Sequence, residues 1–406
     1  MISKRARRWA SQDSYLVRAH FECARDPFDP QTNPGGFVNF GTAENHLMFD
    51  AIAPLLREGV EWHEKDTHYD ELHGAGYLRE AVAGFMSRRA GRRVSPDHLV
   101  LATGATAILE MLAFVLCDPG DAILIPAPYY PGFDHDLGLR SEALVVPVAL
   151  SSPEFRLTVG DIERAYAEQV SRGRRVAAVV LNSPHNPLGS VYDETLVRGV
   201  VELASRYAVH VIIDEMYAES LLLGTQHFSG LRIEAPWVHV VYGFAKDFGL
   251  SGYRVGILHT ENPEVLHAAR NSAYFHTVST LTQRVLAGVL ASPRLDEYFE
   301  KLRARLDSSY RQGTGELEKR GIPFVAAQGG ILLWIDLRAF LPAASVAGER
   351  QLCDRILRDC RVNISPGQAF HCSEPGWFRL CFTMPESHQS EGLRRLVEGL
   401  IPSSRA

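Results

Sequence analysis

Short apolar runs alternate with segments of helical periodicity through the middle of this chain. The runs are rich in Val and Ile and end at Gly, Pro, Asp or Asn, a pattern typical of buried strands in a mostly parallel sheet. Helical segments such as 105–117 and 162–171 lie between them. We therefore expect an α/β layered domain with a mostly parallel, seven-stranded sheet. The predicted strands are 98–102, 122–126, 143–148, 176–181, 209–213, 238–242 and 255–258.

The pattern of hydrophobic and polar residues changes after about residue 292, where a long charged helical segment begins. Strands and helices with more polar faces predict a second, smaller α+β domain there. The stretch 26–45 is rich in Pro and Gly, which oppose regular structure, and it is expected to pack at the junction of the domains. The predicted division is an N-terminal segment 1–45 that packs with the small domain, a large domain 46–292 and a small domain 293–406. Elements of the small domain are expected at 294–319, 330–336, 349–358, 377–383 and 390–400.

Composition and charge exclude several classes of protein. The 406 residues are 46% hydrophobic and 22% charged, which is ordinary for a globular chain and excludes a disordered or collagen-like one. A formal net charge of −6 argues against binding to nucleic acid, which requires a basic surface. No apolar run approaches the ~18 residues of a membrane span. The six cysteines are scattered without a Cys-x-x-Cys pair, so we expect reduced, mostly buried thiols in a cytoplasmic enzyme. The run from His63 to His68 is one residue too long for the zinc motif H-E-x-x-H, and no metal site is predicted.

Candidate chemistry is easiest to localise at lysine, because the chain has only five. Lys246 follows an apolar run, in Tyr-Gly-Phe-Ala-Lys-Asp-Phe-Gly, and an amine at a strand end can form an imine with a carbonyl compound. Arg254 comes eight residues later, while Asp214 and Asn186 follow two other apolar runs. Since the carboxyl ends of strands in an open α/β sheet line one crevice, these four side chains are expected to converge.

This set of residues matches what pyridoxal 5′-phosphate requires. The Lys246 amine can hold the aldehyde, and the Asp214 carboxylate can keep the ring nitrogen protonated, because an opposite charge favours the charged form. The protonated ring then accepts electrons from a carbanion at Cα. The remaining partners are Asn186 and Tyr217 for the ring oxygen and, for the phosphate, Arg254 with the strand-to-helix turn of Gly104, Ala105 and Thr106.

Six longer motifs carry a family resemblance over nearly the whole chain. They lie at 33–36, 41–47, 126–136, 183–189, 244–256 and 365–382. On these motifs the chain resembles the fold-type I, class I and II aminotransferase superfamily, and within it is most similar to 1-aminocyclopropane-1-carboxylate (ACC) synthases. The resemblance implies an aspartate aminotransferase-like fold with pyridoxal 5′-phosphate as the cofactor. It also implies a homodimer in which each active site is completed by the neighbouring subunit.

The resemblance implies roles for residues at matching positions. Lys246 would form the Schiff base and remove the α-proton, and Asp214 would pair with the ring nitrogen. Tyr130 would stack on the ring, with the adjacent Tyr129 as the alternative. Arg379 would bind the substrate α-carboxylate through a bidentate fork. The other implied roles are Asn186 and Tyr217 at O3′, Arg254 with Gly104, Ala105 and Thr106 at the phosphate, and Glu44 near the amino and sulfonium end of the substrate, where the alternative is a plain surface carboxylate.

Two positions depart from the family pattern. Leu72 stands where family members usually carry a tyrosine that reaches across the dimer to the phosphate and the substrate. Gly243 stands where a serine often contacts the phosphate. Losing both donors predicts a looser or re-routed phosphate site, and the change at Leu72 alters the substrate side of the pocket.

The function expected from this resemblance is a reaction of S-adenosylmethionine at Cγ with loss of methylthioadenosine. The product is either the cyclopropane amino acid or an adduct formed when a second substrate captures a β,γ-unsaturated intermediate. The alternative is an aminotransferase that moves an amino group from an amino acid to a 2-oxo acid, with the same cofactor residues. A third alternative is a non-catalytic binding protein, which the retention of Lys246, Asp214, Arg254 and Arg379 disfavours.

Overall fold

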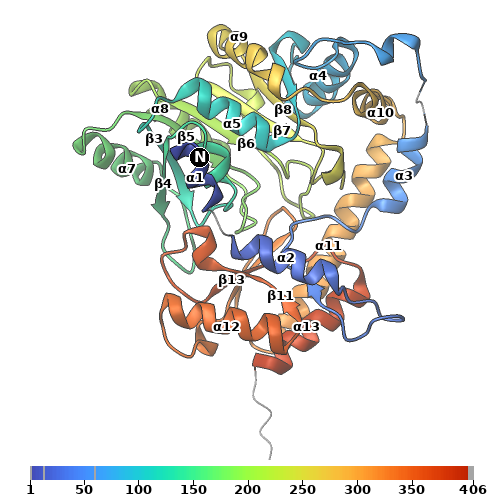
Figure 1. The fold of residues 1–406 in the computed structure, drawn as a ribbon, viewed down its shortest axis with the longest axis vertical. Helices are drawn as coiled ribbons and strands as arrows, with labels where there is room; N and C mark the ends of the chain where they lie inside the picture. Colours follow the sequence, from blue (N-terminus) through green and yellow to red (C-terminus); the bar gives the residue numbers. More distant parts are fainter. Residues whose placement is uncertain (1, 12–13, 59–60, 401–406) are drawn as a thin grey trace, which may run out of the picture.

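The predicted α/β architecture is confirmed by the computed structural model, which describes residues 2–11, 14–58 and 61–400. All seven predicted strands are present, with ends that differ from the prediction by one or two residues. They are β2 (Leu99–Ala102), β3 (Ala122–Ala127), β4 (Leu144–Ala149), β5 (Val176–Asn182), β6 (His210–Asp214), β7 (Val238–Gly243) and β8 (Gly256–Thr260). They form one sheet in the order β2-β8-β7-β6-β5-β3-β4, parallel except for β8, which is antiparallel to both neighbours (Figure 1).

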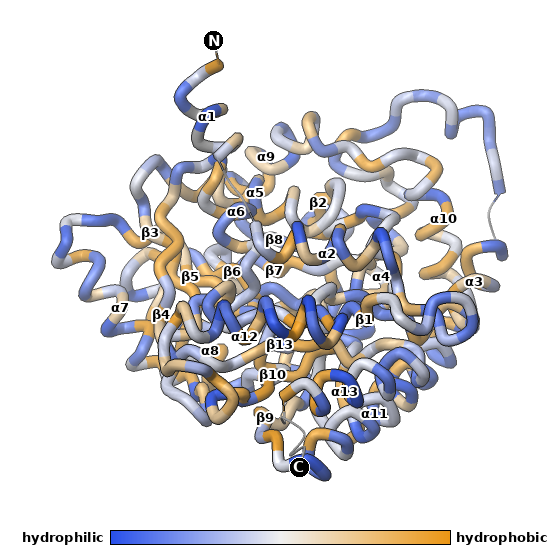
Figure 2. The backbone as a smooth tube through the Cα atoms, turned by 60° about the horizontal axis from the view of Figure 1, so that its bottom comes forward, coloured by the Kyte–Doolittle hydropathy of each residue, from blue (hydrophilic) through white to orange (hydrophobic). Residues whose placement is uncertain are grey.

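Helices cover both faces of this sheet, so the strands form the middle of three layers (Figure 1). The alternation of side chains along β2 separates two apolar clusters: Leu99 and Leu101 belong to one, and Val100 and Ala102 to the other. Figure 2 shows the strands as hydrophobic and the outer helices as largely hydrophilic. The covering helices are α4 (Gly76–Ala90), α5 (Ala105–Leu116), α6 (Phe133–Gly138), α7 (Val159–Ser171), α8 (Glu194–Arg206) and α9 (Pro263–Ser272).

A second, smaller sheet follows in the part of the chain where an α+β arrangement was predicted. Its strands are β9 (Phe324–Val325), β10 (Leu332–Asp336), β12 (Ser365–Pro366) and β13 (Trp377–Cys381), antiparallel in the order β12-β13-β10-β9. The helices of this part are α11 (Leu295–Lys319), α12 (Val346–Asp359) and α13 (Glu386–Leu400). Helix α11 contacts α3 (Phe49–Arg57) and α10 (Thr280–Ala291) on the large-sheet side and α13 on the other (Figure 1). The exact domain boundaries stay a prediction.

The N-terminal segment packs against this smaller part. β1 (Val38–Asn39) pairs in parallel with β11 (Val362–Asn363), and α2 (Tyr15–Arg25) contacts both strands. The sequence pattern did not predict these strands, because two residues are too few to show a periodicity. After β1 the chain continues to the edge of the large sheet, where the Ala43 carbonyl accepts a hydrogen bond from Lys246. Helix α1 (Lys4–Ala10) stands away from the body in Figure 2.

The cysteine thiols are all unpaired, and four of the six are buried. Burial raises the pKa of the Cys23, Cys117 and Cys353 thiols to about 12, so these groups stay protonated near neutral pH. The expectation that the cysteines are mostly core residues is therefore met. Within the described residues, no helix is both long and apolar enough to cross a membrane.

Candidate active site

Polar residues that follow β5, β6 and β7 meet at one edge of the large sheet. Asn182 ends β5 and Asp214 ends β6, and the two residues are paired across the strands. The Asn182 side chain donates to the Asp214 carbonyl oxygen at 3.1 Å and accepts from the Asn186 backbone N–H at 2.7 Å. Lys246 follows the end of β7 by three residues, and its charge acts on the Asp214 carboxylate. The structure thus brings Asn186, Asp214 and Lys246 together.

The Asp214 carboxylate is buried with little compensation for its charge. Its side chain accepts a hydrogen bond from the Met216 backbone N–H at 3.1 Å. Burial raises the pKa of Asp214 to about 7, and the nearby Asp136 carboxylate adds to this effect, while the Lys246 ammonium opposes it. A cationic partner at this carboxylate would restore its ionised form. The site therefore favours a positively charged group beside Asp214.

The Lys246 amine lies in the same site, and its Nζ donates to the Ala43 carbonyl oxygen at 2.6 Å. Burial lowers the pKa of Lys246, and the Glu44 carboxylate partly opposes this shift. A lower pKa makes the neutral, nucleophilic amine more accessible near neutral pH. Sequence analysis missed Ala43, because a backbone carbonyl partner has no signature in residue type.

A candidate phosphate cradle lies where β2 turns into α5. Gly104 precedes the first turn of α5 with a φ of +94°, and Ala105 and Thr106 supply N-terminal amides of that helix. A Cβ added at Gly104 would lie 2.6 Å from Nη2 of Arg254, so the guanidinium lies directly against the turn. Nη1 of Arg254 donates to the Ser251 carbonyl at 3.1 Å, and the residue is exposed in the single chain. The turn and the guanidinium together suit an anion.

Arg379 is a buried cation of β13 that faces neutral acceptors. Its guanidinium donates to the Gly41 carbonyl, to Oδ1 of Asn186 at 3.3 Å and to Oγ of Ser365 at 3.4 Å. Nε of Arg379 is buried with no hydrogen-bond partner among the described residues. Burial lowers the pKa of Arg379. A guanidinium in this state fits a carboxylate ligand, which would satisfy the buried donor and balance the charge.

Comparison with known families and proteins shows the family to which this chain belongs. A family model described as aminotransferase class I and II matches residues 37–396. The chain belongs to this family. It is 38% identical to 1-aminocyclopropane-1-carboxylate synthase 3 of Oryza sativa subsp. japonica, over 88% of this chain and 85% of that one. It is 34% identical to synthase 8 of Arabidopsis thaliana, over 97% and 90% of the two chains.

Solved structures share the fold of this aminotransferase-family chain. The aspartate aminotransferase from Thermus thermophilus with maleate superposes with a TM-score of 0.84 at 23% identity, over 98% of this chain and 99% of that chain. The aspartate aminotransferase from Rhizobium meliloti superposes with a TM-score of 0.83 at 23% identity, over 98% of each chain. The predicted aspartate aminotransferase-like fold is confirmed.

As a family member, the protein is a pyridoxal 5′-phosphate-dependent enzyme. Its donor set fits the cofactor on three observations: the under-compensated carboxylate of Asp214, the amine of Lys246 with its lowered pKa, and the cradle formed by Gly104 and Arg254. Each of these groups suits a different part of the cofactor, namely the ring nitrogen, the aldehyde and the phosphate. The individual residue roles remain predictions.

The two candidate tyrosines for stacking on the cofactor ring differ in burial. The ring of Tyr129 is 1% exposed, and its hydroxyl donates to Oδ1 of Asp134 at 2.7 Å. Tyr129 also stacks on His371, with ring centroids 4.6 Å apart. Tyr130 is 37% exposed, and Asp214 and Arg379 both act on its hydroxyl. The geometry therefore favours Tyr130 over Tyr129 as the stacking residue.

Tyr217 and Glu44 also lie near this family site. Tyr217 is buried, and the charges of Arg379 and Asp214 act on its hydroxyl. Glu44 is half-buried and pairs with the ring of His46 at 3.7 Å. The charge of Glu44 acts on Lys246. Glu44 is thus near enough to the amine to influence its pKa, and its role toward the substrate stays a prediction.

The departure at Gly243 has a steric cause in this chain. A Cβ at this position would lie 2.9 Å from the Val255 carbonyl oxygen and 3.3 Å from both Sδ and Cε of Met216. The backbone carbonyl cannot yield easily, and Met216 already fills the neighbouring space. The serine that the family often carries would therefore not fit here without local movement.

We expect Gly243→Ser to destabilise the protein by about 1–3 kcal/mol, because the added atoms overpack this contact. Gly315→Ser is the matched control, since no atom apart from its chain neighbours and the backbone of its own helix lies within 4 Å of a Cβ at Gly315. Thermal unfolding of the two variants should show a lower midpoint for the first alone. Equal midpoints would mean that the space around Gly243 is not restrictive.

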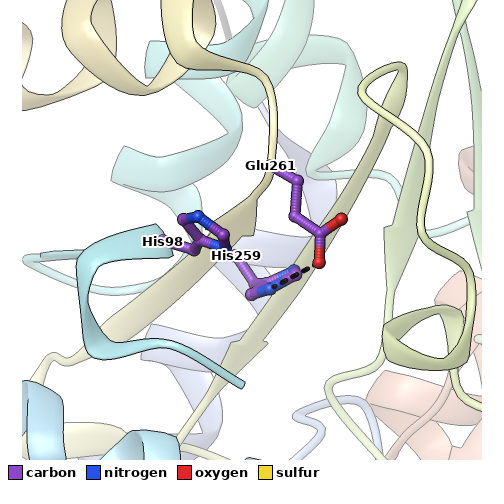
Figure 3. Close-up of side chains that lie close together, drawn as sticks. All are labelled: His98, His259 and Glu261. Carbon is purple, nitrogen blue, oxygen red and sulfur yellow. Dashed lines mark ion pairs between the residues drawn. The ribbon is translucent and has the colours of Figure 1, made fainter. Parts of the chain in front are cut away.

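A second cluster, formed by His98, His259 and Glu261, lies at the opposite end of the large sheet (Figure 3). Their ligand atoms lie within 4.8 Å of one another, and Nε2 of His259 is 3.9 Å from Oε1 of Glu261. Arg92 already binds that carboxylate at 2.7 Å, and its positive charge opposes a metal cation. Burial lowers the pKa of His259 to about 4, so the ring is neutral. We assign the cluster to an Arg92–Glu261 ion pair that stabilises the end of β8.

Proposed function

We propose that this enzyme acts on S-adenosylmethionine at Cγ and releases methylthioadenosine, as an ACC synthase-like enzyme. The similarity to ACC synthases over most of the chain is the observation that carries the choice of substrate. The geometry supports an α-amino acid substrate, because the amine of Lys246 and the guanidinium of Arg379, whose Nε has no partner among the described residues, lie in one site. Such a substrate requires a cation that binds its α-carboxylate and a base that takes the proton from Cα.

The chain's own residues divide the work of this reaction. When bound, pyridoxal 5′-phosphate supplies an aldehyde and a ring that withdraws electrons from Cα. Arg379 would hold the α-carboxylate by two parallel hydrogen bonds, and Lys246 would take the proton from Cα. Asp214 would keep the ring nitrogen protonated, and Glu44 would face the sulfonium charge. In the first route the electron pair left at Cα would form a Cα–Cγ bond as the Cγ–S bond breaks, and methylthioadenosine would leave with the electrons of that bond. In the second route a Cβ proton would be lost, and the electrons of the Cβ–H bond would form a Cβ–Cγ double bond as the Cγ–S bond breaks and methylthioadenosine leaves.

The purified holoenzyme incubated with S-adenosylmethionine tests this proposal. We expect methylthioadenosine, detected by liquid chromatography, to accumulate with time and with enzyme concentration. Mass spectrometry of the amino-acid product then distinguishes ACC from a γ-substituted adduct formed with an added cell extract. Rapid conversion of the cofactor to its amine form by common amino acids, without methylthioadenosine, would instead establish an aminotransferase and refute the proposal.

Leu72 is the position where we expect product choice to change. The side chain is half-buried in the single chain and offers no hydrogen bond. We expect Leu72→Tyr to shift the products toward ACC by about tenfold, because a hydroxyl can bond to a charged group of the cofactor or substrate. Leu223→Tyr, at a side chain that is 61% exposed, is the control. An unchanged product ratio in Leu72→Tyr would show that this residue does not set the outcome.

We further propose that the protein is a cytoplasmic homodimer with shared active sites. The unpaired cysteines support a reducing compartment. An apolar patch supports the dimer, since exposed patches of this kind mark interfaces. Helix α10, which carries Leu281, packs on the short helix at residues 64–67, which Trp62 and Tyr69 flank in the sequence. Light scattering of the purified protein should give twice the mass of the chain. The patch consists of Trp62, Tyr69, Tyr274, Phe275 and Leu281.

A further inference from the structure

We propose that α11 acts as a spacer between the two halves of the active site, with two positioning residues that mark the ends of the spacer: Tyr298 in the first turn of the helix and Ser309 near its middle. Tyr298 fixes the segment that carries Lys246, and Ser309 fixes the strand that carries Arg379. The helix would thereby set the distance between the amine and the guanidinium. The inference rests on the proposed roles of Lys246 and Arg379, and it does not depend on which amino acid is the substrate.

The first end of the spacer is the residue next to Lys246. The Tyr298 hydroxyl of α11 donates to the backbone carbonyl of Asp247 at 3.0 Å. The Tyr298 ring also stacks on Phe248, with centroids 6.0 Å apart and an interplanar angle of 13°. Tyr298 is 2% exposed, so these contacts form in the dry interior. They bind α11 directly to the peptide that follows the lysine.

Asp247 itself is fully buried and held by three donors. Its Oδ2 accepts from the Glu219 backbone N–H and from the Tyr242 hydroxyl, both at 2.9 Å. Its Oδ1 accepts from the Ser220 hydroxyl at 2.7 Å. The carboxylate thus locks the segment after Lys246 to β7 and to the turn after β6. Because both oxygens of the buried Asp247 side chain accept hydrogen bonds, the backbone of Asp247 is held rigidly where Tyr298 binds it.

Two ion pairs on the buried Glu219 carboxylate strengthen the same end. The Glu219 carboxylate binds Arg303 of α11 at 3.1 Å and Arg89 of α4 at 2.6 Å. Glu219 is the residue whose backbone N–H holds Asp247. Helix α11 is therefore connected to the lysine segment by a hydroxyl and, through Glu219, by a charge.

The second end of the spacer lies three turns further along α11. The Ser309 hydroxyl donates to the Phe382 carbonyl at 2.6 Å, and Phe382 follows Arg379 by three residues. The side chain of Gln389 donates to the same carbonyl at 3.1 Å and to the Ser309 carbonyl at 2.9 Å. One continuous helix thus donates a hydrogen bond to the residue after Lys246 and another to the third residue after Arg379. Because both groups would grip one substrate, a small change in this spacing misaligns the Cα proton with the amine.

The two ends can be tested separately with hydroxyl deletions in the full chain. Tyr298→Phe removes the bond beside Lys246, Ser309→Ala removes the bond beside Arg379, and Tyr310→Phe is the matched control. Tyr310 also lies on α11, and its hydroxyl accepts from the Ala327 backbone N–H at 3.1 Å. Asp247→Asn is the second variant for the first end if Tyr298→Phe folds poorly. It can keep an acceptor for the Glu219 and Tyr242 donors but replaces the acceptor of the Ser220 hydroxyl, so it loosens the residue to which Tyr298 binds and should likewise slow cofactor capture.

Two measurements distinguish positioning from general stability. The first is the rate at which each apoenzyme captures pyridoxal 5′-phosphate, followed by absorbance as the Lys246 amine condenses with the aldehyde and water leaves. The second is kcat/KM for methylthioadenosine release. We expect Tyr298→Phe to lower both about five- to tenfold and Ser309→Ala to lower only kcat/KM by a similar factor, with Tyr310→Phe unchanged in both.

The cofactor-capture assay needs no substrate, so it tests the Tyr298 end even if S-adenosylmethionine is not turned over. In that case the second measurement uses whichever amino acid converts the cofactor. Equal effects of Tyr298→Phe and Tyr310→Phe would overturn the proposal. So would a Tyr298→Phe variant that changes only the thermal midpoint.

Discussion

Lys246→Ala should lower methylthioadenosine release by more than about 10⁴-fold, because it removes the group that would both hold the cofactor and take the Cα proton. The amine also donates to the Ala43 carbonyl, and no other lysine lies in this part of the chain. The purified variant should lack the visible absorbance of the cofactor imine. Absorbance and product release, measured on the same preparation, check the two roles together.

Lys301→Ala is the control for this experiment. Lys301 is an exposed residue of α11 that pairs with Glu297 at 2.6 Å, and its loss should leave both readouts unchanged. A Lys246→Ala variant that keeps the imine absorbance, or that retains more than a tenth of the rate, would show that another amine carries the chemistry.

Asp214→Asn should lower turnover by about a hundred- to a few-thousand-fold. Removing one partner of a buried ion pair costs about 3–5 kcal/mol, and each ~1.4 kcal/mol corresponds to a factor of ten. Burial raises the pKa of Asp214 to about 7 in the chain alone, so a cation such as the protonated ring nitrogen is needed to keep it fully ionised near neutral pH. Asparagine cannot supply that charge, and the cofactor would lose its capacity to withdraw electrons from Cα.

Glu215→Gln is a matched control, because Glu215 is the next residue and is equally buried. Its carboxylate accepts from the Ser229 hydroxyl at 2.7 Å and from the Gly230 backbone N–H at 2.6 Å, and burial raises its pKa to about 8. In glutamine the amide oxygen can accept from the Gly230 N–H while the amide NH2 donates to the Ser229 hydroxyl oxygen, so turnover should stay within a few-fold of the parent enzyme. If both variants lost activity to the same extent, the effect would reflect buried charge in general and not a bond to the cofactor.

The large sheet could be predicted because all its strands except the edge strand β4 are buried along nearly their whole length and therefore read as continuous apolar runs. The chain between 26 and 45 was predicted as irregular, and within it the two-residue strand β1 escaped the pattern. Strand β1 exists because a partner, β11, lies beside it, which is a tertiary contact without a local signature.

The candidate site could be predicted to a similar degree. Residues at the ends of parallel strands converge by topology, so Asn186, Asp214 and Lys246 could be grouped from their positions alone. Tyr130 was predicted as the stacking residue with Tyr129 as the alternative, and what distinguishes the two, namely burial and the contact of Tyr129 with Asp134, has no signature in the sequence. Backbone acceptors and the steric limit at Gly243 likewise become visible only in three dimensions.

The most direct test of the account is to identify the lysine that holds the cofactor. The purified holoenzyme is reduced with borohydride, digested, and its five lysines are mapped by mass spectrometry. We expect the reduced pyridoxyl group on Lys246 alone, at a stoichiometry near one per chain. A label on Lys4, Lys65, Lys301 or Lys319 in place of Lys246, or no label on any lysine, would contradict the proposed active site.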